Sequence, residues 1–291
     1  LAINMHVFQM ATKVRHISQY VGVLLLALIV KFLGLVYVHG GGSEKAVFGD
    51  LFEFNVETEE WTCLYTPSGT DTGNVEPAAR NMHSMAYWKD KLYIWGGAGL
   101  DNVPCDTKLW SFDLGSKTWQ ATATSGDSPG PRFSQVAQCL SVSGKEDEDD
   151  ASGKWLFFGG METNQVQNGA IKTSNDLFIL NLSSGTWHQQ ITGSHAPSPR
   201  SGCTHGLLTL NNTQALLVYG GLSGSECLYD AFVYWIDREV WEEVEQRGQI
   251  PGPRCAAASG GMRGNMLLAV GGASTAAVFD TVHVGMLLPT S

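Results

Sequence analysis

Short hydrophobic runs alternate with polar, glycine-rich segments along this chain, and five of these runs end in a pair of glycines. Counted from the first glycine of each pair, successive pairs are 56, 63, 61 and 51 residues apart. A pattern that recurs at such intervals indicates a repeat architecture, in which each repeat is one unit of a larger array. The five runs with their glycine pairs are Leu35–Gly41, Leu92–Gly97, Trp155–Gly160, Leu216–Gly221 and Met266–Gly272.

The segment after each glycine pair follows a second pattern. A polar loop leads to an aspartate and a short strand-like stretch, and in four units a turn and a tryptophan come next. We therefore expect four strands in each unit: strand b ends in the glycine pair, strand c follows the aspartate, and strand d carries the tryptophan. The aspartates are Asp50, Asp106, Asp176, Asp230 and Asp280, and the tryptophans are Trp61, Trp119, Trp187 and Trp241.

A Pro-x-Pro-Arg motif, or a close variant of it, precedes the later units, and strand a is expected directly after its arginine. One four-stranded sheet cannot bury both of its faces. Sheets arranged radially around an axis cover one another and leave only short edges exposed. The repeats thus predict an all-β propeller with five recognisable four-stranded blades. The arginines of the four motifs are Arg80, Arg132, Arg200 and Arg254.

These units resemble kelch repeats, which build β-propellers. The likeness lies in the glycine pairs, the strand-c aromatic residues and the spaced tryptophans, and the Pro-x-Pro-Arg linkers resemble those of the subgroup with Rab-effector, cell-polarity and nitrile-specifier proteins. Kelch propellers usually have six or seven blades, so the five units are either the whole ring or part of a larger one. We expect an N-terminal extension at 1–23 and a propeller at 24–291, with blades near 24–76, 77–128, 129–196, 197–250 and 251–291.

The N-terminal region allows more than one interpretation. The hydrophobic stretch Val21–Val30 fits a signal or membrane anchor, but the repeat spacing favours strand a of the first blade at Leu24–Val30. We expect the strand, and with it a cytoplasmic protein; secretion or anchoring through Val21–Val30 is the alternative. The last unit has no tryptophan after its strand c. Either Met5–Thr12 supplies its outer strand, or further blades lie outside this chain.

The composition of the chain and the motifs that it lacks limit the classes of function to be considered. A formal net charge of −10 argues against nucleic acid as a partner. The six cysteines are widely spread and are expected to be thiols, not a disulfide framework. The chain has no Gly-x-Gly-x-x-Gly, phosphate-binding loop or His-Glu-x-x-His motif. We expect a non-catalytic scaffold or adaptor that binds a protein or peptide and needs no cofactor.

The candidate binding face follows from the strand order. The linkers between blades (d–a) and the loops between strands b and c (b–c) are expected on the same side of the propeller. Arginine captures carboxylates well, and arginines at this position bind acidic peptides in kelch adaptors, so the resemblance implies an acidic or C-terminal carboxylate motif. Structural bonds to neighbouring carbonyls or aspartates are the competing role for each arginine. The candidate residues are Arg80, Arg132, Arg200, Arg254, Asp101, Asn102, Glu162, Asn164 and Ser223.

One stretch bears on metal binding. Nitrile-specifier relatives hold iron through a Glu-x3-Asp-x3-His motif, and this chain has Glu226 and Asp230 at that spacing. Tyr234 replaces the histidine, so the motif is broken and we expect no metal. A metal-dependent specifier-type or oxidase-type enzyme on a kelch propeller is the alternative function.

Overall fold

The computed structural model is built almost entirely of short strands, with one 3-10 helix, η1 (Leu100–Asn102), in its described part. Most strands run antiparallel to the strand that follows them in the chain. The all-β prediction is therefore confirmed. The structure describes residues 2–8, 27–31, 34–43, 45–68, 75–140, 153–167, 170–191, 193, 195–262 and 264–288.

The first three sheets each contain a four-stranded antiparallel meander, and each meander follows the predicted order from strand a to strand d. Strand b ends at the glycine pair in all three, because both glycines adopt positive φ values that end the ladder. In chain order the strands are β2 (Ala27–Lys31), β3 (Leu35–His39), β4 (Leu51–Asn55) and β5 (Glu60–Tyr65); β6 (Ser84–Trp88), β7 (Lys91–Trp95), β8 (Leu109–Asp113) and β9 (Thr118–Thr122); and β11 (Val136–Leu140), β12 (Lys154–Phe158), β15 (Leu177–Asn181) and β16 (Thr186–Gln190).

The fourth and fifth sheets differ at their edges. In the fourth sheet, strands b and c continue past the glycine pair as a hairpin. In the fifth sheet, the N-terminal strand β1 pairs antiparallel with strand c and so takes the place of strand d. The strands are β17 (Thr204–Leu210), β18 (Thr213–Ser223), β19 (Glu226–Trp235) and β20 (Val240–Glu243) in the fourth sheet, and β22 (Ala258–Met262), β23 (Met266–Val270), β24 (Val282–Leu288) and β1 (Ala2–Phe8) in the fifth.

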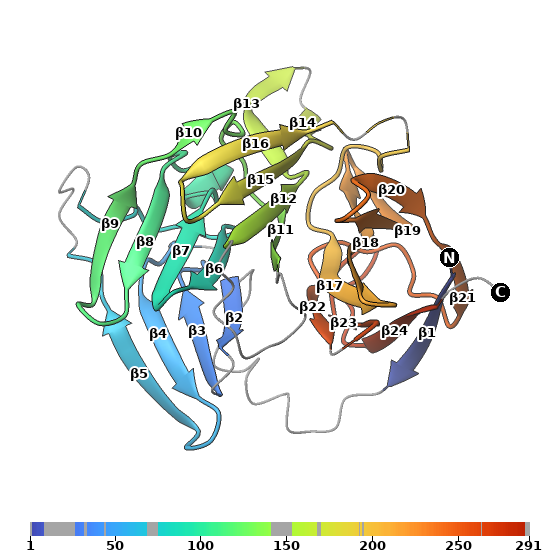
Figure 1. Cartoon of the computed structure of the whole chain (residues 1–291), viewed down its shortest axis with the longest axis horizontal. Coiled ribbons are helices and arrows are strands. Elements are labelled where there is room, and N and C mark those ends of the chain that lie inside the picture. Colours follow the sequence, from blue (N-terminus) through green and yellow to red (C-terminus); the bar gives the residue numbers. More distant parts are fainter. Residues whose placement is uncertain are drawn as a thin grey trace.

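The five sheets are arranged radially, as Figure 1 shows, with their first strands toward the middle of the ring. Strand a of each sheet contacts strand a of the next, from β2 to β6, β11, β17 and β22. This arrangement confirms the β-propeller prediction. Four short strands complete the described set: β10 (Ser125–Gly126), β21 (Glu245–Gly248), and the hairpin of β13 (Met161–Gln167) and β14 (Ala170–Thr173) in the third b–c loop.

The core lies between neighbouring sheets, where the strand-d tryptophans lie. Trp119 packs with Tyr37 of the first sheet, and Trp187 packs with Trp95 of the second. Each therefore contacts the preceding blade. Trp61 is the exception: 51% of its surface is exposed, since the described residues bring no preceding sheet against it. The tryptophan of the first unit therefore differs from the others, because in the described structure it does not pack between two sheets.

The N-terminal expectations have separate outcomes. The strand expected at Leu24–Val30 is β2, which begins at Ala27; residues 24–26 lie outside the described part. Of the two options for the last unit, the outer strand is observed, but at Ala2–Phe8 instead of Met5–Thr12. Among the described residues, no helix is long and hydrophobic enough to cross a bilayer.

Candidate functional site

The arginine of each Pro-x-Pro-Arg linker points into the protein, toward the end of strand b in its own blade. The Arg80 guanidinium donates to the carbonyl of Gly96 at 3.0 Å, and Arg200 donates to the carbonyl of Gly220 at 3.1 Å. Each Nε–H also bonds a carbonyl two residues earlier, which folds the linker back on itself. The d–a linkers and the b–c loops therefore meet on one side of the propeller, which we call the linker face.

The same arginines connect each blade to the one before it. The carbonyl oxygen of Arg80 accepts a bond of 3.0 Å from Gly41 N–H, and that of Arg132 accepts one of 2.9 Å from Gly97 N–H. Arg200 and Arg254 repeat the contact with the next glycine pairs. Each of the four linker arginines is thus joined by a backbone hydrogen bond to the glycine pair of the preceding blade. Together these bonds connect neighbouring blades from the first sheet to the fifth.

This close approach explains the first glycine of the first four pairs. A Cβ atom on Gly40 would lie 2.3 Å from the carbonyl oxygen of Arg80, and one on Gly159 would lie 2.5 Å from that of Arg200. Both glycines also have φ values near +65°, a region that residues with a side chain rarely adopt. The sequence pattern of apolar run and glycine pair therefore has its cause in the contact between blades.

In three blades the guanidinium also bonds a carboxylate of the b–c loop. Arg80 Nη2 lies 2.9 Å from Asp106 Oδ2. Arg200 holds Asp230 with two bonds, of 2.6 and 2.8 Å, in the bidentate geometry that suits guanidinium and carboxylate. The arginine side chains are fully buried, while each aspartate is about one third exposed. The aspartate that precedes strand c thus balances a charge that would otherwise be buried alone.

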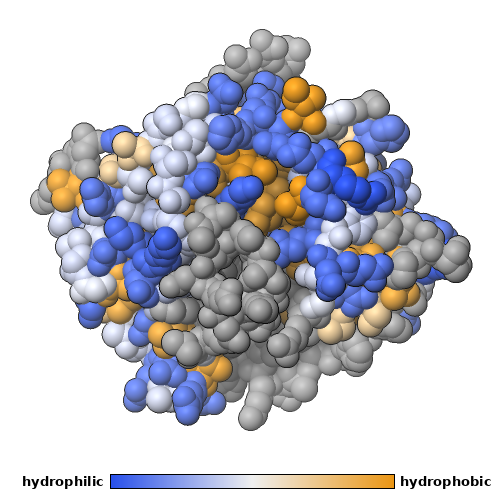
Figure 2. All heavy atoms as spheres, viewed as in Figure 1, coloured by the Kyte–Doolittle hydropathy of each residue, from blue (hydrophilic) through white to orange (hydrophobic). Residues whose placement is uncertain are grey.

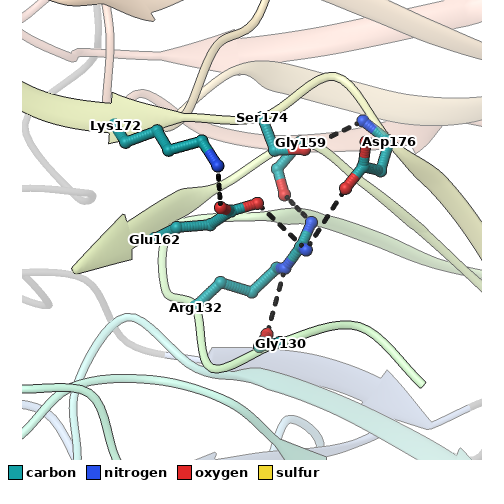
Figure 3. Close-up of polar contacts among 7 residues, drawn as sticks. All are labelled: Gly130, Arg132, Gly159, Glu162, Lys172, Ser174 and Asp176. Carbon is teal, nitrogen blue, oxygen red and sulfur yellow. Dashed lines mark hydrogen bonds and ion pairs between the residues drawn. The ribbon is translucent and has the colours of Figure 1, made fainter. Parts of the chain in front are cut away.

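Arg132 has the most carboxylate partners, as Figure 3 shows. Its Nη2 atom lies 3.3 Å from Glu162 Oε1 and 3.5 Å from Asp176 Oδ2, and Nη1 donates to the carbonyl of Gly159. Glu162 in turn pairs with Lys172 across the β13–β14 hairpin, at 3.0 Å. Burial lowers the pKa of Arg132, and the two carboxylates oppose that shift. The hairpin is therefore tied to the linker by charge.

Arg254 departs from this pattern. Its Nη1 donates to the carbonyl of Gly271 at 2.9 Å and lies 3.5 Å from the hydroxyl of Thr281, but no carboxylate of the described residues pairs with it. Thr281 stands ten residues after Gly271, the spacing at which the first, second and fourth units have aspartate, and Asp280 next to it is exposed. Burial lowers the pKa of Arg254. This guanidinium is thus the least neutralised of the four.

The other predicted residues all lie in b–c loops. Asp101 and Asn102 belong to η1, where Asn102 is exposed; the Asp101 side chain is outside the described part. Asn164 lies in β13, and its side chain is likewise not described. Ser223 ends β18 at the tip of the fourth hairpin and is partly buried. The fold gathers these loops on the linker face, but it does not unite their side chains in one cluster.

Exposed apolar residues were missed in the sequence, because a hydrophobic residue in a loop carries no signal of its exposure. Large apolar side chains are exposed at eleven described positions, and eight of them lie in b–c loops or d–a linkers. Figure 2 shows such residues around the ring, with hydrophilic ones between them. The eight residues of the linker face are Phe48, Val75, Leu100, Val103, Ile191, Tyr229, Ile250 and Val278.

Two histidines form a buried pair between the first and second sheets. Nδ1 of His39 lies 3.0 Å from Nε2 of His83, and Trp119 packs against the His39 ring. Burial lowers the pKa of His39 to about 3 and, with the neighbouring His39, lowers that of His83 well below its ordinary value. Both imidazole rings are therefore neutral at physiological pH and form part of the protein core.

Glu226, Asp230 and Tyr234 stand at the spacing of the iron-binding motif, and each has other surroundings in the structure. Both carboxylate oxygens of Asp230 are engaged by Arg200, Glu226 is exposed, and Tyr234 is buried in the core of the third and fourth sheets. In the described part of the chain, no group of three or more His, Cys, Asp or Glu side chains is arranged to hold a metal ion.

Comparisons with known proteins agree with this architecture. Acyl-CoA-binding domain-containing protein 4 of Arabidopsis thaliana is 26% identical over 86% of this chain, which spans 35% of that protein. A leucine-zipper-like transcriptional regulator 1 homolog of Drosophila melanogaster is 28% identical over 68% of the chain, and multiple epidermal growth factor-like domains protein 8 of Rattus norvegicus is 28% identical over 82% of it. The chain spans 18% and 8% of these two proteins. The family model of the attractin/LZTR1 β-propeller matches residues 36–280, and the chain therefore belongs to that family.

Proposed function

We propose that this propeller is a non-catalytic interaction module that binds a protein or peptide on its linker face. One observation carries the proposal: of the eleven large apolar residues that are exposed in the described part of the chain, eight lie in the loops of that face. Scattered apolar residues are normal on a protein surface, but their concentration on one side marks an interaction site. A propeller also presents its loops on a rigid scaffold, as binding proteins commonly do.

The arginines of the linkers have a structural part in this proposal. Arg80 and Arg200 are fully buried and already bonded to carbonyls and carboxylates, so they hold the loops in position for the partner. Arg254 has a bonded carbonyl and no carboxylate among the described residues. An acidic or C-terminal carboxylate of the partner would therefore bind best beside Arg254, where the other blades supply an aspartate of their own.

A cytoplasmic location is part of the same proposal. In the structure no disulfide joins Cys63, Cys105, Cys203, Cys227 or Cys255 to another cysteine. Proteins of oxidising compartments commonly join such residues in disulfides, whereas cytosolic thiols stay reduced. The thiols support a reducing compartment, and cell fractionation with an antibody against the chain tests it.

The binding face is tested by two matched double variants. Leu100→Ser with Val103→Ser removes two exposed apolar side chains from the linker face, where they are 50% and 62% exposed. Val56→Ser with Val240→Ser removes two at the turns between strands c and d on the opposite side, where they are 51% and 42% exposed. Tagged versions of both variants and of the parent chain are used to capture partners, which are quantified by mass spectrometry.

The proposal predicts that partners bound by the parent chain fall at least tenfold with the Leu100/Val103 variant and stay with the Val56/Val240 variant. Circular dichroism first confirms that both variants are folded. Partners that stay with both variants, or that fall equally with both, contradict the linker face. Turnover of a substrate that depends on residues of the linker face contradicts a non-catalytic role.

A further inference from the structure

Two cysteines from neighbouring blades face each other on the linker face. Cys227 lies in β19 at the start of strand c in the fourth blade, and Cys255 follows Arg254 in the linker to the fifth blade. Their sulfur atoms are 3.9 Å apart, and both residues are partly buried. A disulfide has its sulfurs about 2.05 Å apart, so the side chains have to move closer by about 2 Å to bond.

Backbone hydrogen bonds join the chain segments that carry the two cysteines. The N–H of Arg254 donates to the carbonyl of Leu228 at 3.1 Å, and these residues are the direct neighbours of the two cysteines. Gly221 N–H also donates to the carbonyl of Arg254 at 2.9 Å, and Cys255 itself pairs with Ala273. These bonds fix both chain segments, so the side chains are the parts that have to rotate for the sulfurs to meet.

We infer that Cys227 and Cys255 are a redox-sensitive pair, which a disulfide oxidant of the glutathione class joins into a bond between the fourth and fifth blades. The thiolate of Cys227 attacks one sulfur of glutathione disulfide, forms a mixed disulfide and releases the first glutathione thiolate. Cys255 loses its proton and attacks Cys227 Sγ, which releases the second glutathione. Two protein thiols are oxidised, and one glutathione disulfide is reduced to two glutathione molecules.

The surroundings of the two cysteines indicate which thiol reacts first. Cys227 is next to the exposed hairpin tip at 224–226, where an oxidant has access. Burial, together with the neighbouring Cys227, raises the pKa of Cys255 to about 11, so this thiol is protonated at neutral pH and suits the second step. Cys203 lies within electrostatic reach of Cys255 but is buried, which raises its pKa to about 12 and makes it a poor competitor.

The bond would fix two parts of the linker face to each other. It would join the hairpin of the fourth b–c loop to the linker that carries Arg254. Its effect on partner binding rests on the proposed function, whereas the bond itself does not. A failure to form the bond and a failure to bind a partner on this face are therefore distinguished by separate measurements.

The test uses the whole chain, incubated with glutathione disulfide or with excess reduced glutathione. Free thiols are blocked, the protein is digested without reductant, and linked peptides are identified by mass spectrometry. Thermal melting is measured for both states. We expect a Cys227–Cys255 link after oxidation and a melting temperature about 5 °C above that of the reduced protein, because the bond closes a loop in the unfolded chain.

Three variants make the outcome specific. Cys227→Ser and Cys255→Ser are expected to abolish both the link and the rise in melting temperature. Cys63→Ser, which removes an exposed thiol in β5 of the first blade, is expected to change neither. The inference is overturned if both thiols stay open to alkylation after oxidation, if the link joins Cys203 instead, or if the Cys227 variant melts at a higher temperature on oxidation as the parent does.

Discussion

The substitution Arg200→Ala examines the contact on which the linker face depends. The arginine side chain is fully buried and bonds the carbonyl of Gly220, both oxygens of Asp230 and the backbone of Ser198. Alanine removes all of these donors at once. It leaves Asp230 without its counter-ion and the Gly220 carbonyl without that donor. The comparable substitution in the fifth blade, Arg254→Ala, removes carbonyl bonds but leaves no carboxylate alone.

The magnitude follows from the burial of the two charges. Removing one partner of a buried ion pair costs about 3–5 kcal/mol of unfolding free energy. Asp230 is 32% exposed and regains some hydration, so we expect the lower end of that range, about 3 kcal/mol, for Arg200→Ala. Arg254→Ala loses hydrogen bonds to neutral carbonyls, for which we expect about 1–2 kcal/mol. The difference between the two variants is the part due to the carboxylate.

Urea unfolding, monitored by tryptophan fluorescence, measures the loss of unfolding free energy in both variants. The slope of that free energy against urea concentration is compared between variants to check that their unfolded states are alike. The double variant Arg200→Ala/Asp230→Ala is the control, since it removes both charges together. It should lose less stability than the sum of the two single variants. Equal losses for Arg200→Ala and Arg254→Ala, or a loss below about 1 kcal/mol for Arg200→Ala, would refute the structural role of the carboxylate pair.

Two further predictions concern the glycine pairs and the buried histidines. Gly159→Ala places a Cβ atom 2.5 Å from a backbone oxygen and should cost about 3 kcal/mol by urea unfolding, whereas Gly224→Ala, at positive φ in open space, should cost about 1 kcal/mol; similar losses would argue against the close contact. For the histidines, the unfolded chain binds protons between pH 6.5 and 3 that the folded chain does not, because burial lowers the pKa of His39 to about 3 and that of His83 well below its ordinary value. The free energy of unfolding should therefore fall as the pH is lowered through that window, by about 2 kcal/mol for His39 alone at pH 5. Urea midpoints that are equal at pH 7.5 and pH 5 would contradict the buried neutral pair.

The fold could be predicted from the sequence because its physical constraints recur along the chain. The glycine pairs of the first four units admit the carbonyl of the next linker arginine, so the pair has to reappear in each of these blades. The aspartate before strand c likewise repeats, and in three blades it neutralises a buried guanidinium. Such local constraints place the same residue types at corresponding positions of successive units. The ion pair of Arg80 and Asp106 is an example.

Other features of the structure do not produce a repeating pattern in the sequence. The exposure of Leu100 or Tyr229 depends on how a loop is folded, and neither residue is unusual in the sequence. In the last unit, the motif placed the aspartate at Asp280, but the position that faces Arg254 belongs to Thr281, one residue later. The exposed surface of Trp61 arises because no described sheet packs against it, which no residue of its own unit could indicate.

Cross-linking mass spectrometry of the complex with a captured partner tests the central claim most directly, because exposed lysines lie on both sides of the propeller. Lys45, Lys108 and Lys172 lie in b–c loops of the linker face, and Lys89 and Lys117 lie in turns on the opposite side. A short amine-reactive reagent should join the partner to the first three lysines, and these links should be lost when the partner is released. Links that concentrate at Lys89 and Lys117 would contradict the linker face as the binding surface.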